Sequence, residues 1–225
     1  MQRASGLFNE EQRQQIEQVV IEAEAKTSCE IVPVVATASG RYDRAEDIIG
    51  LWLAVFSAMA VWLMFPRQSN DPGSWEGVPF YVGLSALVFG IVLAFIVGVV
   101  AGSRMAWLRR LFIPQRQILE EVSARAREIF FDKRVHHTSG ATGMLIYVSL
   151  FERTAVVLGD RAVLERLGQS SLDRLCQQLT KDLQRGDPTM AICSVIAEAG
   201  KQLSGPLPRP VGDVNELHDP LVLID

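Results

Sequence analysis

The chain has 225 residues, of which 48% are hydrophobic and 21% are charged, and its formal net charge is -4 at pH 7. The hydrophobic content excludes a disordered chain, and the acidic balance argues against a whole-chain nucleic-acid binder, for which a basic surface is expected. Cys29, Cys176 and Cys193 lie far apart in the sequence. Their spacing predicts neither a disulfide framework nor a zinc site, so we expect reduced thiols in a cytosolic compartment.

The first 47 residues predict one helix followed by one strand. Asn9 and Gln12 have the spacing of a capping box, and apolar residues follow at helical intervals. Residues 29–37, CEIVPVVAT, have the β-branched composition of a strand. Pro33 within this strand predicts an edge position or a bulge, because proline cannot donate to a sheet ladder. The polar start of the chain differs from a signal peptide, so no cleaved leader is expected.

Two segments without Asp, Glu, Lys or Arg follow, at residues 48–65 and 80–102. A bilayer core about 30 Å thick needs about 20 apolar helical residues, and both segments have roughly this length. We therefore predict two transmembrane helices, joined by a short extracytoplasmic loop at residues 66–79. The alternative is a pair of buried helices in a soluble core, which two long uncharged segments disfavour in a chain of this size.

Basic residues flank this predicted hairpin on one side. Arg41 and Arg44 precede it, and Arg104, Arg109, Arg110 and Arg116 follow it, whereas the connecting loop contains Arg67 alone. Because cytoplasmic flanks carry an excess of Lys and Arg, this distribution predicts that both termini are cytoplasmic and that the protein resides in the plasma (inner) membrane.

Small residues recur at every fourth position in both segments. They are Gly50, Ala54 and Ala58 in the first segment, and Ala86, Gly90, Ala94, Gly98 and Gly102 in the second. Such stripes allow helix backbones to approach closely in lipid, where no hydrophobic force drives helices together. We expect the two helices to pack on each other through these faces. Formation of a homo-oligomer through the longer stripe is the competing use.

The chain beyond the hairpin predicts further helices and a pair of strands. Residues 103–204 contain two short strands, at 144–150 and 154–158, whose spacing suits an antiparallel hairpin. Residues 205–225 form a Pro-rich tail, whose apolar end is expected to dock back. Neither side of the membrane hairpin can bury both faces of its elements alone. We therefore predict one discontinuous α/β domain, in which helices pack on a small mixed sheet interrupted by the hairpin.

Three segments resemble the TPM domain family. They are TGMLIYVSLFERTAVVLGDR at residues 142–161, CEIVPVVATASGRYDRAED at residues 29–47 and DVNELHD at residues 213–219. The family is also described as a phosphatase domain of thylakoid-lumen photosystem-repair proteins. The resemblance implies a bacterial-type, membrane-anchored TPM domain that faces the cytoplasm. The chain differs from the lumenal members by its inserted hairpin, and from some bacterial relatives by the lack of a long Gly-rich tail.

Acidic residues near the strand ends are the candidates for chemistry. A phosphatase needs a nucleophile, or metal ions held by several carboxylates and histidines. Asp160 ends the second strand of the predicted strand hairpin, and Asp43, Glu46 and Asp47 follow the first strand of the chain. If these strand ends converge, the four carboxylates would bind a divalent cation such as calcium or magnesium. Alternatively, Asp160 caps a turn and the other three are solvated charges.

No complete catalytic group of residues is recognisable in the sequence. The leading hypothesis is therefore an interaction or scaffold domain, anchored in the lipid bilayer, whose partner is another membrane or cytoplasmic protein and not a nucleic acid. A metal-dependent phosphatase acting on phosphomonoesters, with Asp160 at its site, is the alternative. A third hypothesis is an oligomer-forming helper of a larger membrane complex.

Overall fold

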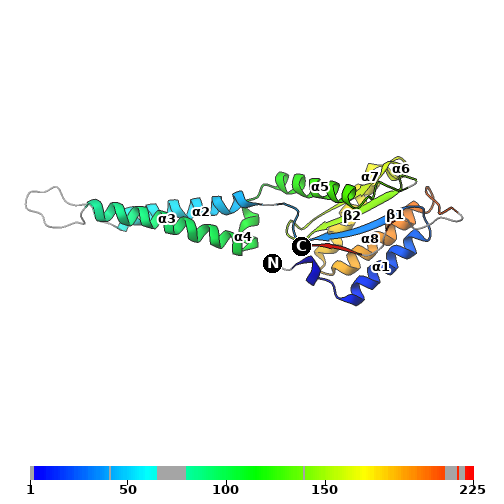
Figure 1. The fold of residues 1–225 in the computed structure, drawn as a ribbon, viewed down its shortest axis with the longest axis horizontal. Helices are drawn as coiled ribbons and strands as arrows, with labels where there is room; N and C mark the ends of the chain where they lie inside the picture. The colour runs from blue at the N-terminus through cyan, green and yellow to red at the C-terminus, as the bar shows by residue number, and fades with distance from the viewer. Residues whose placement is uncertain (1–2, 41, 65–79, 139, 211–216, 218–220) are drawn as a thin grey trace, which may run out of the picture. The chain divides into compact units, whose positions relative to one another are not determined.

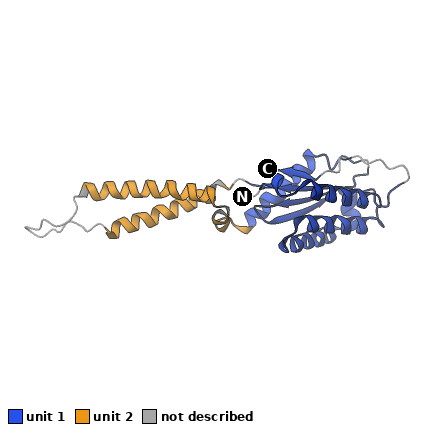
Figure 2. Cartoon of the chain, turned by 90° about the horizontal axis from the view of Figure 1, so that it is seen from below, with its two compact units in different colours: residues 1–40, 116–225 blue, residues 41–115 orange. Residues whose placement is uncertain are grey.

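The computed structural model describes residues 3–40, 42–64, 80–138, 140–210, 217 and 221–225. The chain forms two compact units, which Figure 2 colours separately. Residues 1–40 and 116–225 make up the α/β unit, and residues 41–115 make up the hairpin unit. The α/β unit therefore takes its residues from both sides of the hairpin unit. The predicted loop at 66–79 and most of the segment DVNELHD lie outside the described residues.

The α/β unit is built on a four-stranded mixed sheet. Its strands are β1 (Glu30–Ala36), β2 (Gly143–Ser149), β3 (Thr154–Gly159) and β4 (Val222–Ile224), in the order β3-β2-β1-β4. β1 runs parallel to both β2 and β4, whereas β2 and β3 are antiparallel. The predicted mixed sheet and strand hairpin are confirmed, and the apolar end of the tail docks back as β4.

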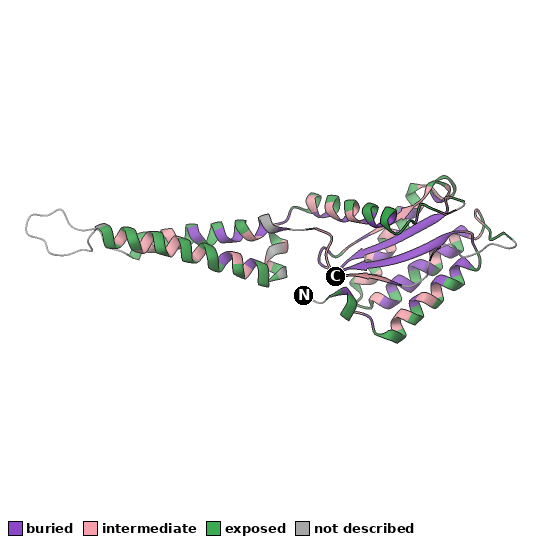
Figure 3. Ribbon diagram, viewed as in Figure 1, coloured by how far each residue is buried: buried purple, intermediate pink, exposed green. Residues whose placement is uncertain are grey.

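Helices cover both faces of the sheet (Figure 1). They are α1 (Glu10–Glu24), α5 (Gln115–Asp132), α6 (Arg161–Leu167), α7 (Gln169–Gln184) and α8 (Pro188–Leu203), with a short 3-10 helix at Ala4–Gly6. Ile31, Met144 and Val157 pack into a common core with residues of α1, α7 and α8. Because side chains alternate along a strand, Leu145 and Tyr147 point to the opposite face, on which α5 lies. Every residue of β1 and β2 is buried (Figure 3).

The ladder between β1 and β2 joins the two parts of the discontinuous unit. It pairs the strands over their whole length, from Glu30 opposite Gly143 to Ala36 opposite Ser149. β1 precedes the hairpin unit in the chain and β2 follows it. The N-terminal strand therefore completes a sheet whose other strands all lie beyond the hairpin unit.

Two local sequence signals, the capping box at Asn9 and the proline within β1, can be followed in the structure. The Asn9 side chain accepts from the Gln12 N–H at 2.8 Å, and the Gln12 side chain accepts from the Asn9 N–H at 2.9 Å, which forms the predicted capping box of α1. Pro33 lies opposite Ile146 of β2, but the ladder with β4 begins only at Val34. β1 is therefore an interior strand and not the edge strand that Pro33 predicts, but β2 alone pairs alongside Pro33 itself, so the missing N–H is tolerated.

The hairpin unit consists of α2 (Asp43–Met64), α3 (Phe80–Arg104) and the short α4 (Ala106–Leu111). Within α2 and α3, the segments Ala45–Met64 and Tyr81–Arg104, of 20 and 24 residues, are long and apolar enough to cross a membrane. Both helices extend beyond the uncharged segments, because helical hydrogen bonds continue through charged turns. The short helix α4 was not predicted.

Small residues lie where α2 and α3 come closest. A Cβ atom added at Gly98 would lie 2.6 Å from the Gly50 Cα atom, and one added at Gly50 would lie 2.8 Å from Val99 Cγ2. Added Cβ atoms at Gly90 and Gly102 would also meet α2, at 3.2 Å from Ser57 Oγ and 3.1 Å from Ile49 Cδ1. Among the alanines of the two stripes, Ala54 is buried, while Ala58, Ala86 and Ala94 are half-buried. The backbones therefore approach most closely at Gly50 and Gly98, where no side chain fits.

We predict that Gly98→Ala loosens the contact between α2 and α3, whereas Gly83→Ala in the same helix does not. Both changes raise helix propensity by up to about 1 kcal/mol, but only the Gly98 change places a methyl group against backbone. We expect the overlap to outweigh the propensity gain by about 1–3 kcal/mol. Hydrogen exchange of hairpin peptides in detergent micelles measures the effect. Equal exchange in the two variants would contradict the close packing.

Candidate functional site

A buried polar cluster lies at the end of the sheet where β1 and β2 terminate side by side. It consists of Ser39, Tyr147, Ser149 and Glu152, and we call it the strand-end cluster. The Glu152 side chain comes from the turn between β2 and β3, yet the residue is only 1% exposed. In open α/β sheets, the region beyond the carboxyl ends of parallel strands commonly binds ligands. The cluster therefore occupies the position at which function is expected on this sheet.

Backbone hydrogen bonds hold the elements that bear this cluster. Leu150 donates its N–H to Ala36 O at 2.9 Å, and Phe151 donates to Thr37 O at 3.0 Å, so the turn after β2 remains attached to the segment after β1. Tyr147 and Ser149 are two residues apart on β2 and thus project from the same face. The chain reverses into β3 with Arg153 in the left-handed region, at φ 52°. These constraints place Glu152 beneath residues 37–40.

Glu152 binds the segment that leaves β1. Its Oε1 accepts from the Ser39 N–H at 2.8 Å and from the Gly40 N–H at 3.2 Å, and its Oε2 accepts from the Ser149 hydroxyl. A buried carboxylate needs several donors, because removal of its charge from water is costly. The sequence continues from Gly40 through a single residue, which is not described, to Tyr42 and then to α2. Glu152 therefore fixes the last residues of the α/β unit before the chain enters the hairpin unit.

The hydroxyl groups of the cluster form a directed chain of hydrogen bonds. Ser39 Oγ lies 2.8 Å from Tyr147 Oη and donates to Ser149 Oγ at 2.9 Å. Since each hydroxyl has one proton and Ser149 donates to Glu152, the remaining bond runs from Tyr147 to Ser39. Burial raises the pKa of Tyr147, and the charge of Glu152 contributes in the same direction. The phenol is thus kept as a neutral donor at the head of a chain that ends on a carboxylate.

Asp160, the first candidate from the sequence, lies at the N-terminus of α6. Its Oδ1 accepts from the Arg161 N–H at 2.7 Å, so one oxygen serves as a helix cap. Its Oδ2 is buried without a hydrogen bond to any described residue. The capping alternative therefore accounts for one of the two carboxylate oxygens.

The other three acidic candidates belong to the hairpin unit. Asp43 is the first residue of α2, and Glu46 and Asp47 follow in its first turns. Glu46 is half-buried and Asp47 is exposed, whereas the side chain of Asp43 is not described. The described residues contain no group of three His, Cys, Asp or Glu side chains that could hold a metal ion. The divalent-cation site with Asp160 therefore remains a prediction.

The cysteines lack the environment of reactive thiols. All three are free, with Cys29 and Cys193 buried and Cys176 half-buried. Burial is the largest cause that raises the pKa of each thiol, and the neighbouring carboxylates of Glu24 and Glu30 raise the pKa of Cys29 further. A nucleophilic cysteine needs a lowered pKa and an electropositive neighbourhood. Cysteine-based phosphate transfer therefore has no support at these positions.

The strand-end cluster was not predicted from the sequence. The glutamate in the short turn between two apolar strands is one signal that could have indicated it. Acidic side chains are rarely buried without partners, so a glutamate at this position indicates a group of hydrogen-bond donors around it. Tyr147 and Ser149, which interrupt an apolar strand on one face, are a second signal. Neither signal identifies Ser39 as the partner, because that contact joins segments on either side of the hairpin.

Comparisons with known proteins identify a related fold. No family model and no curated protein matches the sequence. The chain is similar to the NMR structure of BA42 protein from the psychrophilic bacteria Bizionia argentinensis sp. nov., with a TM-score of 0.55 and 15% sequence identity. The similarity covers 96% of this chain and 94% of that chain. At this level of identity, the comparison establishes a shared fold.

We predict that Glu152→Gln destabilises the α/β unit. An amide retains one oxygen acceptor but turns an N–H₂ group toward donors, so at least one buried donor loses its partner, at a cost of about 1–3 kcal/mol. Glu165→Gln is the matched control, because Glu165 makes an exposed pair with Arg161 that contributes at most about 0.5 kcal/mol. Urea denaturation in micelles compares the two free energies of unfolding. Equal values would contradict the role of Glu152.

We also predict that the native thiols react slowly with a disulfide reagent such as DTNB at pH 8. The raised pKa values keep the thiolate fraction of each cysteine below that of a free thiol, and burial restricts access as well. Denaturation should release all three thiols for rapid reaction. A native thiol that reacts as fast as the denatured protein would contradict the assignment of inert cysteines.

Proposed function

We propose that the protein is an integral membrane protein that presents a TPM-like α/β domain at the cytoplasmic face of the plasma (inner) membrane, as an interaction or scaffold module. One observation carries the proposal. Two long apolar helices pack on each other through glycine contacts and leave most of their large side chains outside the contact. Only 17% of the apolar window in α2, and 6% of that in α3, is buried within the chain.

Exposed apolar side chains support insertion into lipid. Leu63 is 76% exposed and Phe89 is 68% exposed, and similar side chains continue along both helices. Burial of each such side chain is worth about 1.5–3 kcal/mol, so water is an unfavourable environment for this surface. The helices also satisfy their own backbone hydrogen bonds, as a membrane span requires. The alternative of two core helices in a soluble domain would need these side chains to be buried.

Positive charges at the ends of the spans support the orientation. Arg104 ends α3, and Trp107, which is 62% exposed, follows on α4. An exposed indole beside arginines is typical of the region where headgroups meet the apolar core. With both termini on the side of these arginines, the α/β unit faces the cytoplasm.

The chemistry of the described residues favours interaction over catalysis. Glu152 uses both oxygens to hold residues 39 and 40 and Ser149, and Asp160 uses one to cap α6. The three cysteines are buried or half-buried thiols. A scaffold role requires a stably folded domain, and the hydrogen bonds from Ser39 and Gly40 to Glu152 contribute to the stability of the α/β unit.

Topology reporters test the membrane assignment. Alkaline phosphatase inserted after Gly73 should be active, because this enzyme folds only outside the cytoplasm, whereas the same reporter fused after Asp225 should be inactive. Fluorescent protein fusions at the two positions should give the reverse pattern. The protein should also remain in the pellet after carbonate washing of membranes. Extraction by carbonate, or an inverted reporter pattern, would contradict the proposal.

Hydrolysis of a generic phosphomonoester tests whether the domain is a module without catalysis. Purified protein with p-nitrophenyl phosphate, assayed with and without magnesium or calcium, should show no turnover above the Asp160→Asn variant. Turnover that depends on the cation and is lost in Asp160→Asn would replace the scaffold assignment with a phosphatase.

A further inference from the structure

The outer edge of β3 has backbone groups that do not take part in the sheet. β3 is the last strand in the order β3-β2-β1-β4, and the described residues place no strand beyond it. Asp160 donates its N–H to Gly143 O at 2.8 Å, so these residues form a hydrogen-bonded pair of the antiparallel ladder. Because such pairs alternate, the N–H and C=O groups of Ala155, Val157 and Gly159 point away from β2.

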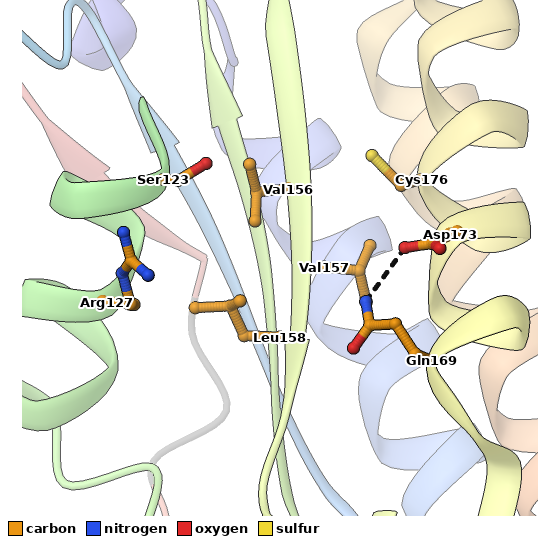
Figure 4. A pocket seen from close by; sticks show the side chains of 8 residues that line it. All are labelled: Ser123, Arg127, Val156, Val157, Leu158, Gln169, Asp173 and Cys176. Atoms are coloured by element: carbon orange, nitrogen blue, oxygen red, sulfur yellow. Dashed lines mark hydrogen bonds between the residues drawn. The ribbon is translucent and has the colours of Figure 1, made fainter. Parts of the chain in front are cut away.

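A cavity of about 300 Å³ lies along this edge, between α5 and α7 (Figure 4). Its lining residues are Ser123 and Arg127 from α5, Val156, Val157 and Leu158 from β3, and Gln169, Asp173 and Cys176 from α7. The figure shows Val156 and Leu158 turned toward α5, and Val157 turned toward α7. The edge of the strand therefore forms the floor of a groove with a helix on either side, which we call the β3-edge groove.

Cys176 occupies part of this edge. Its thiol donates to Ala155 O at 3.0 Å, and the Val157 N–H donates to its sulfur. Hydrogen bonds to sulfur are weak, so they exchange readily for bonds to a peptide backbone. Ala155 and Val157 are 5% and 4% exposed, so Cys176 and its helix cover this part of the edge. The next outward groups along the strand are Val157 C=O and Gly159 N–H, where an added strand can begin to pair after it displaces the bonds to Cys176.

The two sides of the groove carry opposite charges. Arg127 is exposed on the α5 side and makes no ion pair with any described residue. Asp173 lies on the α7 side, where its Oδ1 accepts from the Gln169 side chain at 2.9 Å. Side chains of a strand alternate between the two faces of a sheet. A strand added to β3 would therefore direct one residue toward Arg127 and its neighbour toward Asp173.

We propose that the β3-edge groove binds an extended segment of a partner protein as a fifth strand of the sheet. The segment has an acidic side chain that faces Arg127 and an adjacent basic side chain that faces Asp173. Backbone hydrogen bonds to the edge supply affinity, and the two charges supply register and direction. The inference rests on the proposed interaction function and identifies its surface and the chemistry of its partner.

A labelled peptide tests the proposal with the full-length protein in micelles. The probe is an eight-residue peptide of valines and threonines with one adjacent glutamate–lysine pair at its centre. Fluorescence anisotropy measures its binding, and hydrogen exchange of residues 154–159 reports whether it pairs with β3. We expect binding with slower exchange of the Gly159 amide.

Arg127→Glu should weaken binding about tenfold, because it places like charges together. Arg166→Glu, which changes an exposed arginine of α6 outside the groove, should bind as the unchanged protein does.

A second peptide distinguishes strand addition to β3 from nonspecific electrostatic binding of the peptide. A peptide with prolines at alternate positions loses backbone donors, and it should not bind. Binding without slower exchange in β3, equal binding of the proline peptide, or equal binding by Arg127→Glu would each overturn the proposal. So would a dimer of the protein that dissociates in Arg127→Glu, because a second copy would then occupy the groove. The topology reporters do not depend on this peptide, so failure here leaves the membrane assignment intact.

Discussion

The structure depends on the parallel pairing of β1 with β2. The chain leaves the sheet after Ala36, runs through two long apolar helices and returns to form the neighbouring strand. Parallel strands require a crossover connection of a dozen or more residues, and here the hairpin unit lies within that connection. The ladder, together with the packing of α1 on α8, therefore holds together two parts of a domain that are separated by residues 41–115. A weak ladder would leave both parts with exposed apolar faces.

The strand-end cluster adds hydrogen bonds at the end of the ladder from which the chain continues toward the hairpin unit. Glu152 accepts backbone donors at Ser39 and Gly40, the last described residues before the hairpin unit. The hydroxyl chain from Tyr147 extends the same restraint into β2. β3 begins two residues after Glu152 and forms the outer edge of the sheet, part of which Cys176 covers.

Local patterns in the sequence are enough to predict most elements. The Asn9 capping box, the apolar periodicity of the helices and the uncharged spans depend on near neighbours, and all are visible in the chain order. Contacts between distant segments cannot be predicted from such patterns. The pairing of β4 with β1, the partner of Glu152 and the cover of the β3 edge by Cys176 depend on the register of strands, which a single sequence does not specify. The cation site predicted around Asp160 depends on proximity between distant strand ends in the same way, and it stays a prediction, because the side chain of Asp43 is not described.

The central claim is that β1 and β2 belong to one cooperative domain, although the hairpin unit lies between them in the chain. Native-state hydrogen exchange of the full-length protein, measured for residues 30–36 and 143–149 over increasing denaturant, tests it most directly. If the claim holds, the slowest amides of both strands open with the same free energy and the same dependence on denaturant. If β1 opens at a clearly lower free energy than β2, the N-terminal strand is a loosely added edge and the two parts do not form a single domain.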